Sequence, residues 1–385
     1  MKKNRNVVLN LKLTYKFNND EKNMEIERLE SLEPSNIEVY VREGDTIYVD
    51  TGDYVYINQL LKESTNGIKS YATVSGTVER TEDKIIITND NSNSALVSEE
   101  AMESIADIKK EDIIRTCETL GIDFENKLIV NKLKEHSKLL IVNAMDVEPY
   151  QFNSNYLVQD NVKNLLDTIS LLSKRFNLDA YLLLNKYDDN NVNEVKETIS
   201  SYPDINFKVI NDVYPFNVNK IIARKFFNEY KFEDILFLDA MSLYKIFVAL
   251  KDGLPVSERY ITVCLNDPGK AYVIKAKYGS NVYDVIKDTV NPDFNDKDIY
   301  LNNFMRKVKC DNLESNIVTD NIRTVFIFDK DDNVPSKCIK CGKCVDICPV
   351  GINPLAKKLD ASCIRCGLCN YVCPANINLI NSREK

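Results

Sequence analysis

The chain has 385 residues, of which 44% are hydrophobic and 28% are charged, and its formal net charge is −8 at pH 7. Such a length exceeds what one hydrophobic core supports, so we expect about two to four domains. The acidic balance argues against a nucleic-acid-binding protein, which needs a basic surface. The sequence contains one histidine, His136, which argues against a Ser-His-Asp triad or a His-rich metal site.

Hydropathy argues against direct membrane insertion. No apolar run reaches the ~18 residues that a membrane-spanning helix needs, because segments 138–145 and 234–250 are short or interrupted by charge. Residues 1–6 are basic but are not followed by the apolar stretch of a signal peptide. We therefore expect a cytoplasmic protein, held at the inner face of the cell membrane only through partner proteins if at all.

The first predicted domain is a small all-β unit over residues 36–98, which follows an N-terminal extension, residues 1–35. Short alternating strands and glycine-containing turns occupy residues 37–57, and a strand pair is predicted over 71–88. The string ATVSGTV at 72–78 looks like the hairpin of a lipoyl-like barrel-sandwich hybrid. Its tip has no lysine to carry biotin or lipoate, so we interpret this unit as a docking or structural module.

The next region, residues 99–252, alternates strand and helix patterns. Short apolar strands separated by helices of 10 to 15 residues are typical of a parallel sheet covered on both faces, so we predict a Rossmann-like α/β domain. The predicted strands are 138–143, 180–185, 207–211 and 234–238, and the predicted helices are 162–176, 191–202 and 218–229.

Strand patterns return after this domain and predict a β-grasp (SLBB-like) unit over residues 253–300. Two strands, 260–265 and 271–275, are joined by the turn Asn-Asp-Pro-Gly at 266–269 and followed by a helix from Asn281. Residues 301–334 are predicted to be a linker with some helical structure.

The last predicted domain, residues 335–380, contains eight of the 11 cysteines. They form one pattern twice, with three cysteines at i, i+3 and i+6 and a fourth before a proline, and the two copies are offset by 25 residues. Three such cysteines bind three corners of an iron–sulfur cube, and the fourth ligand comes from the Cys-Pro of the other copy. The predicted ligands of cluster 1 are Cys338, Cys341, Cys344 and Cys373; those of cluster 2 are Cys363, Cys366, Cys369 and Cys348.

This pattern predicts a ferredoxin-like domain with two [4Fe–4S] clusters. Gly342 and Gly367 occupy equivalent positions in the two loops, where the absence of a side chain lets backbone N–H groups approach the cluster sulfurs. The alternative is zinc, which paired C-x2-C elements also bind. A third cysteine at i+6 and a Cys-Pro in each copy favour iron–sulfur clusters. The remaining cysteines, Cys117, Cys264 and Cys310, are interpreted as free thiols.

The order of these modules resembles that of the RnfC family, the C subunits of the Rnf electron transport complex, over roughly residues 35–380. Several strings carry the resemblance in addition to the cysteines: VSGTV at 74–78, LIVNA at 140–144, VEPY at 147–150 and PVSER at 255–259. In that family, a glycine-rich loop ahead of the Glu-Pro-Tyr string holds the FMN phosphate, and NADH stacks on the flavin. The resemblance maps the family's acidic residue of this site to Glu148.

Two features argue against a working FMN and NADH site in this chain. The segment that corresponds to the glycine-rich loop, residues 113–124, contains one glycine, Gly121, flanked by Glu118 and Asp123. A phosphate site needs successive backbone N–H groups and disfavours nearby carboxylates. A second family landmark, Tyr-Pro followed by paired glycines, is reduced here to Tyr-Pro-Phe-Asn at 214–217. Glu148 is then either a remnant of the site or a structural residue.

Three functions are consistent with the sequence. The first is an electron-transfer protein without flavin that relays electrons between redox partner proteins, such as a membrane electron transport complex or a dedicated reductase. The second is an NADH-dependent oxidoreductase subunit in which FMN binds through an altered loop. The third is a non-redox scaffold subunit whose clusters hold the C-terminal domain folded. The sequence contains no signature that names the electron donor or acceptor.

Overall fold

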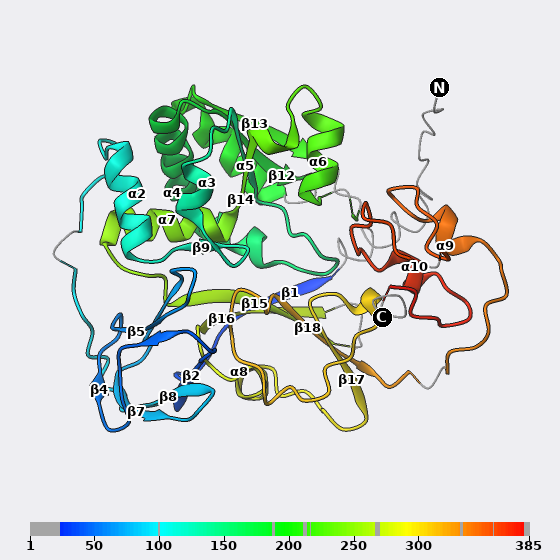
Figure 1. The fold of residues 1–385 in the computed structure, drawn as a ribbon, viewed down its shortest axis with the longest axis horizontal. Coiled ribbons are helices and arrows are strands. Elements are labelled where there is room, and N and C mark those ends of the chain that lie inside the picture. The colour runs from blue at the N-terminus through cyan, green and yellow to red at the C-terminus, as the bar shows by residue number, and fades with distance from the viewer. Residues whose placement is uncertain are drawn as a thin grey trace.

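The computed structural model describes residues 24–98, 101–186, 189–210, 214–215, 217–265, 270–331, 334–356 and 358–380. The predicted turn at 266–269 and Phe216 lie outside the described residues, as does most of the predicted N-terminal extension. The fold is a mixed α/β arrangement of several units, with the cysteine-rich C-terminal module at one end (Figure 1). As the fold-class prediction required, a parallel sheet is combined with smaller β units.

The small β unit is built from two short sheets around one core. One sheet has the order β2 (Asn36–Tyr40), β8 (Lys84–Asn89), β7 (Gly76–Arg80) and β4 (Tyr54–Val55); the other has the order β3 (Thr46–Ile47), β5 (Leu60–Glu63) and β6 (Lys69–Tyr71). Ile37, Leu61 and Ile85 are fully buried between them. Gly76 is required at the start of β7, because a Cβ there would lie 1.8 Å from the carbonyl oxygen of Thr88. The predicted strands are therefore present.

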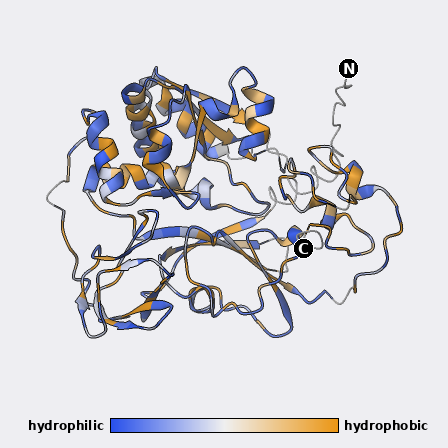
Figure 2. Ribbon diagram, viewed as in Figure 1, coloured by the Kyte–Doolittle hydropathy of each residue, from blue (hydrophilic) through white to orange (hydrophobic). Residues whose placement is uncertain are grey.

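The α/β domain contains a four-stranded, fully parallel sheet. Its order is β13 (Ile205–Ile210), β12 (Asp179–Asn185), β11 (Leu139–Asn143) and β14 (Ile235–Asp239). The helices are α2 (Lys110–Thr119), α3 (Ile129–Leu133), α4 (Asn153–Phe176), α5 (Asp189–Thr198), α6 (Asn219–Phe226) and α7 (Ala240–Asp252). The strands are largely apolar (Figure 2), as expected of a sheet that is covered on both faces.

Alternate residues of β11 pack into different cores. Leu140 and Val142 join the core formed with α4 and α7, whereas Leu139 and Ile141 join the core formed with Ile222 of α6. Because successive side chains of a strand point to opposite faces, α4 and α7 cover one face of the sheet and α6 covers the other. The predicted helices and parallel strands of this region are therefore confirmed.

A five-stranded mixed sheet connects the α/β domain with the C-terminal module. Its order is β1 (Glu25–Glu30), β16 (Lys270–Lys277), β15 (Glu258–Leu265), β18 (Thr324–Asp329) and β17 (Lys297–Leu301), and β15 and β18 form its parallel centre. The helix α8 (Val282–Thr289) packs against it, and the side chain of Asn281 caps this helix by accepting hydrogen bonds from the N–H groups of Tyr283 and Asp284.

Two strands of this sheet differ from the sequence predictions. Strand β18 lies in residues 301–334, which were predicted as a linker with helical structure. Its run Thr-Val-Phe-Ile is buried on both faces, and a short apolar run without alternation does not distinguish a strand from other buried structure. Strand β1 lies within the predicted extension 1–35 and pairs in parallel with β16 at the edge of the sheet. It was not predicted because its sequence is highly charged, as is common in edge strands.

The C-terminal module contains two short helices and little other regular structure. The helices α9 (Lys343–Asp346) and α10 (Leu368–Tyr371) each begin after a glycine with positive φ, Gly342 or Gly367. The module lies beside the sheet end that carries the 3-10 helix η3 (Phe304–Arg306). Among the described residues, no helix combines the length and the apolarity that crossing a membrane requires.

Candidate metal centre

The two cysteine loops have the same backbone conformation. Lys340 and Arg365 have φ values of 57° and 54°, and the glycines two residues later, Gly342 and Gly367, have φ values of 80° and 84°. The N–H of Lys340 donates to Sγ of Cys338 at 3.4 Å, and the N–H of Arg365 donates to Sγ of Cys363 at 3.4 Å. The backbone thus turns its N–H groups towards sulfur in both loops, as a negatively charged cluster requires.

The cysteines surround two separate small cavities. One is lined by Cys338, Cys341, Cys344 and Cys373, and the other by Cys348, Cys363, Cys366 and Cys369. Each set therefore combines three cysteines of one repeat with the Cys-Pro cysteine of the other. These are the two sets predicted from the sequence.

The arrangement of the sulfurs fits a cluster better than a single ion. Each cavity is otherwise lined mostly by apolar side chains, including Leu355, Ile377 and Leu379 around the first. Four thiolates around an apolar cavity are the donor set of a [4Fe–4S] cube. Among the described residues, no group of three or more His, Cys, Asp and Glu side chains is placed to hold a metal ion.

The loop of the second cavity is seated on the body of the protein. Gly367 lies so close to η3 that a Cβ would be 2.8 Å from the carbonyl carbon of Met305 and 2.9 Å from the nitrogen of Arg306. Leu368 and Met305 are buried together with Tyr214 and Ile347. The guanidinium of Arg306 donates to the carbonyl oxygen of Arg365 at 3.0 Å.

Glu148 lies at the junction of three units, next to this loop. Its carboxylate accepts a hydrogen bond from Nδ2 of Asn303 at 2.5 Å and pairs with the guanidinium of Arg306 at 3.1 Å. The same amide of Asn303 donates to Tyr214 Oη at 2.9 Å, and Tyr214 donates to the carbonyl oxygen of Cys366 at 2.5 Å. Burial raises the pKa of Glu148, opposed by Arg306 and Asn303. The carboxylate that the resemblance assigned to a flavin site therefore helps to hold the second cysteine loop. We call the contact region that holds this loop its seat: Glu148, Tyr214, Asn303, Met305 and Arg306.

The segment equivalent to the flavin loop is mainly helical. Residues 113–119 belong to α2, whose side chains Ile113 and Cys117 are completely buried. The N–H of Ile122 donates to the carbonyl oxygen of Cys117 at 3.0 Å. Backbone N–H groups that bond within the helix and its C-terminal turn do not point at an anion. Of the second landmark, Tyr214 holds the cysteine loop, and Nδ2 of Asn217 donates to the carbonyl oxygen of Asp146 at 2.6 Å.

The other three cysteines form no disulfide bond with any described residue. Cys117 and Cys264 are buried, and Cys310 is half-buried. Burial raises the pKa of the Cys117 thiol to about 12, which suppresses its reactive thiolate form.

Asp146 is a buried carboxyl group that stabilises the start of α4. It accepts hydrogen bonds from the N–H groups of Ser154 at 2.8 Å and Asn155 at 3.2 Å, and burial raises its pKa to about 6. Since the folded form then takes up the proton more readily than the unfolded chain, this group's contribution to stability falls as pH rises through the raised pKa. Between about pH 5 and about pH 7.5 we expect a loss of about 1 to 1.5 kcal/mol.

Asp146→Asn should abolish this part of the pH dependence. Denaturant unfolding followed by circular dichroism at several pH values measures it, as the difference in free energy of unfolding between wild type and variant. That difference should change by the stated amount across the range. Parallel curves for the two proteins would contradict the assignment.

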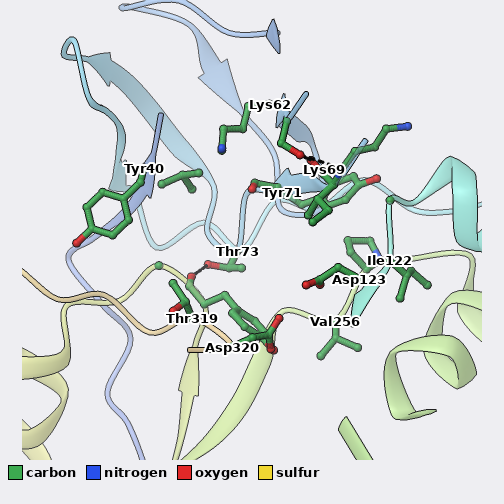
Figure 3. A pocket seen from close by; sticks show the side chains of 18 of the residues that line it. Tyr40, Lys62, Lys69, Tyr71, Thr73, Ile122, Asp123, Val256, Thr319 and Asp320 are labelled. Atoms are coloured by element: carbon green, nitrogen blue, oxygen red, sulfur yellow. Dashed lines mark hydrogen bonds between the residues drawn. The ribbon is translucent and has the colours of Figure 1, made fainter. Parts of the chain in front are cut away.

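A cavity of about 320 Å³ lies between the small β unit, the α/β domain and the five-stranded sheet. Figure 3 shows Lys62 and Tyr71 of the small β unit on one wall and Thr319 and Asp320 on the opposite wall. Its buried charges are paired with one another. Lys62 binds Asp45 at 2.5 Å, and Lys245 binds Asp320 at 2.5 Å and Asp123 at 3.0 Å. The Lys245–Asp320 pair joins the α/β domain to the five-stranded sheet unit, whereas the Lys62–Asp45 pair lies within the small β unit.

Family models identify the two cysteine loops independently. A 4Fe-4S binding domain model matches residues 334–352, and a second 4Fe-4S binding domain model matches residues 363–377. The chain is an iron–sulfur protein with two [4Fe–4S] clusters.

The chain also resembles one curated relative over much of its length. That relative is the C subunit of the ion-translocating oxidoreductase complex of Buchnera aphidicola; the two are 22% identical over 240 residues, which is 59% of this chain and 50% of the relative. The chain thus spans about half the length of that relative. With its two C-terminal cluster motifs it is a divergent, RnfC-like chain, and the resemblance seen in the sequence is confirmed.

Two solved structures share a distant likeness with the iron–sulfur chain. They are the NAD+-reducing [NiFe]-hydrogenase in its H2-reduced state, with a TM-score of 0.42 and 13% identity, and in its air-oxidized state, with a TM-score of 0.43 and 14% identity. Each match covers 57% of this chain and 46% of the other.

Sequence reasoning missed the residues that hold the second cysteine loop. Asn303 and Arg306 lie in a segment predicted as linker, and they meet Glu148 and Tyr214 only in the folded chain. The one local signal was Asn303 itself, whose side chain accepts the N–H of Met305 at 3.0 Å as a helix cap.

Proposed function

We propose that the chain is an electron-transfer protein that relays single electrons between redox partner proteins through its two clusters, without a flavin of its own. The observation that carries this proposal is the crossed arrangement of the cysteines around two neighbouring cavities, one seated on the body of the protein and one beside an exposed loop. When bound, the clusters supply one-electron redox chemistry. Because every corner of each cube receives a cysteine, no open iron is left for a substrate.

The residues assigned to this role are the eight cysteines. Cys338, Cys341, Cys344 and Cys373 would hold cluster 1, and Cys363, Cys366, Cys369 and Cys348 would hold cluster 2. Arg306 and Asn303 would fix the position of the second loop, and Glu148 would fix the side chains of both. Glu148 would therefore be a positioning residue, not a ligand of FMN or NADH.

The finer domain assignment supports a protein with several docking surfaces. We infer that residues 36–98 form a lipoyl-like barrel-sandwich hybrid, 99–252 a Rossmann-like domain and 335–380 a two-cluster ferredoxin-like domain. We extend the β-grasp (SLBB-like) unit from the predicted 253–300 to include β18. The partners would be redox proteins of a membrane electron transport complex or a dedicated reductase, with the chain on the cytoplasmic side.

Cys344→Ala tests the relay directly. Reconstituted wild-type protein should contain about eight irons, no FMN, and clusters whose absorbance NADH does not bleach. The variant should lose about half of the iron and most electron transfer from a dithionite-reduced sample to a protein acceptor, with unchanged circular dichroism. Cys310→Ala, at a cysteine outside both sets, is the matched control and should behave as wild type.

Three outcomes would contradict the relay. Bound FMN with bleaching by NADH would favour an NADH-dependent oxidoreductase. A full iron complement whose reduced-state EPR spectrum lacks coupled [4Fe–4S] signals would favour a scaffold. Undiminished transfer by Cys344→Ala would remove cluster 1 from the electron path.

A further inference from the structure

The two cysteine repeats have the same local structure but different surroundings, so each serves as a reference for the other. In the second repeat, Gly367 lies against η3 and Asn370 is completely buried. At the equivalent positions of the first repeat, a Cβ on Gly342 would meet only the carboxylate of Asp346 at 3.9 Å, and Val345 is 36% exposed. The first loop therefore faces solvent where the second faces the protein.

The exposed loop carries both apolar and basic side chains. We call it the cluster-1 face: Val334, Lys337, Ile339, Lys340, Lys343 and Val345. Ile339 is 66% exposed and Val334 is 82% exposed, beside the exposed cysteines Cys338 and Cys341.

The side chains of this face that are not cluster ligands are predominantly basic, whereas the chain as a whole carries −8. Residues 334–346 contain three lysines and one carboxylate, Asp346, and the negative charge of the thiolates belongs to the cluster that the lysines surround. Exposed apolar side chains bordered by charges of one sign are typical of a protein-binding surface whose partner carries the opposite charge.

We propose that the cluster-1 face is the docking site for an acidic one-electron carrier protein. The inference rests on the proposed relay and names the partner of the same site. Ile339 and Val345 would bury against the apolar centre of the carrier's surface, and the three lysines would pair with carboxylates around it. Each encounter moves one electron, so that one protein is oxidised by one electron and the other reduced by one, with no bond made and no proton transferred.

Charge reversal at this face tests the proposal. The triple variant Lys337→Glu, Lys340→Glu, Lys343→Glu is compared with the control Lys109→Glu, Lys220→Glu, Lys231→Glu, which changes the net charge equally at exposed lysines of the α/β domain. The probe is an acidic plant-type [2Fe–2S] ferredoxin, and its Kd is measured by calorimetry at about 20 mM and about 300 mM salt.

Wild type should bind the ferredoxin at low salt and lose affinity at high salt. The cluster-1 variant should bind about tenfold or more weakly at low salt, with little remaining salt dependence. The control should match wild type, and all three proteins should contain the same amount of iron. For cytochrome c, a basic one-electron carrier, the order should be reversed: the cluster-1 variant should bind it more tightly than wild type does.

The docking proposal fails if wild type does not bind the ferredoxin, or if both triple variants weaken binding equally. It also fails if the cluster-1 variant binds as tightly as wild type. Stopped-flow transfer separates this failure from failure of the relay. Binding without electron transfer would overturn the relay alone, whereas transfer that is indifferent to the charge reversal would overturn the docking site alone.

Discussion

Removing Cys338 and Cys373 together is expected to cost the protein no more iron than removing Cys338 alone. The two sulfurs line the same cavity, although they belong to different repeats. Once Cys338→Ala has abolished cluster 1, the loss of a second ligand of that cluster changes nothing further. Both variants should retain about four irons after reconstitution, measured as iron per chain together with acid-labile sulfide.

The comparison with Cys348 decides whether the ligands are crossed. Cys338→Ala combined with Cys348→Ala removes one ligand from each proposed set, so the protein should retain almost no iron. Ligation within each repeat would give the opposite result, with about four irons left in this pair and almost none in the Cys338 and Cys373 pair. Iron content thus separates the two ligand schemes without any assay of activity.

Gly367→Ala should release the second cysteine loop from its seat. The new Cβ would lie 2.8 Å from the carbonyl carbon of Met305 and 2.9 Å from the nitrogen of Arg306. These are backbone atoms of η3, so the loop itself must move. Together with the positive φ, the expected cost is about 2 to 5 kcal/mol. Hydrogen exchange of peptides that cover residues 302–308 should accelerate about 100-fold.

Gly342→Ala is the matched control for this substitution. Gly342 has almost the same φ, 80° against 84°, but a Cβ added to it would lie 3.9 Å from its nearest neighbour, the carboxylate of Asp346. Both variants should have the same backbone strain, about 1 to 2 kcal/mol. Only Gly367→Ala should also have the steric clash with η3. Exchange at 302–308 should stay at the wild-type rate in Gly342→Ala; equal acceleration in both variants would show that η3 is not the seat.

Local signals predicted the elements whose chemistry is local. The spacing of the cysteines is sufficient to predict the two cluster-binding loops, because a loop of seven residues must wrap three corners of one cube and the Cys-Pro motif supplies the fourth ligand. The strands of the α/β domain were predictable because burial on both faces demands apolar runs such as Leu139–Asn143.

Elements that depend on distant partners were not predictable. Helix α4 is broken at Asn161, where φ is −138° and ψ is 23°, so the predicted start at 162 marks its second part, and the part that begins at Asn153 was missed. Its polar first turns are poor helix formers, and Asp146 stabilises them from outside the helix. Likewise, β1 is charged enough to resemble a solvated extension, yet Arg28 pairs with Asp160 of α4 at 2.5 Å.

The seat of the second loop combines residues that no sequence pattern links. Tyr214 and Asn303, which are far apart along the chain, both donate to the carbonyl oxygen of Cys366, and Glu148 accepts a hydrogen bond from Asn303. These contacts form only after three units have folded. The family resemblance drew attention to Glu148 for a different reason. Its contacts in the structure give the same side chain a positioning role.

The short connection between β18 and the C-terminal module makes the contact between the second cysteine loop and η3 an intramolecular one. Residues 330–337 join Asp329, the last residue of β18, to Cys338, and η3 belongs to the same sheet unit. This short connection reaches at most about 30 Å, so the module is always present at its seat at an effective concentration in the millimolar range. A few hydrogen bonds, one glycine contact and the packing of Leu368 with Met305 are therefore sufficient to hold the second cysteine loop in place.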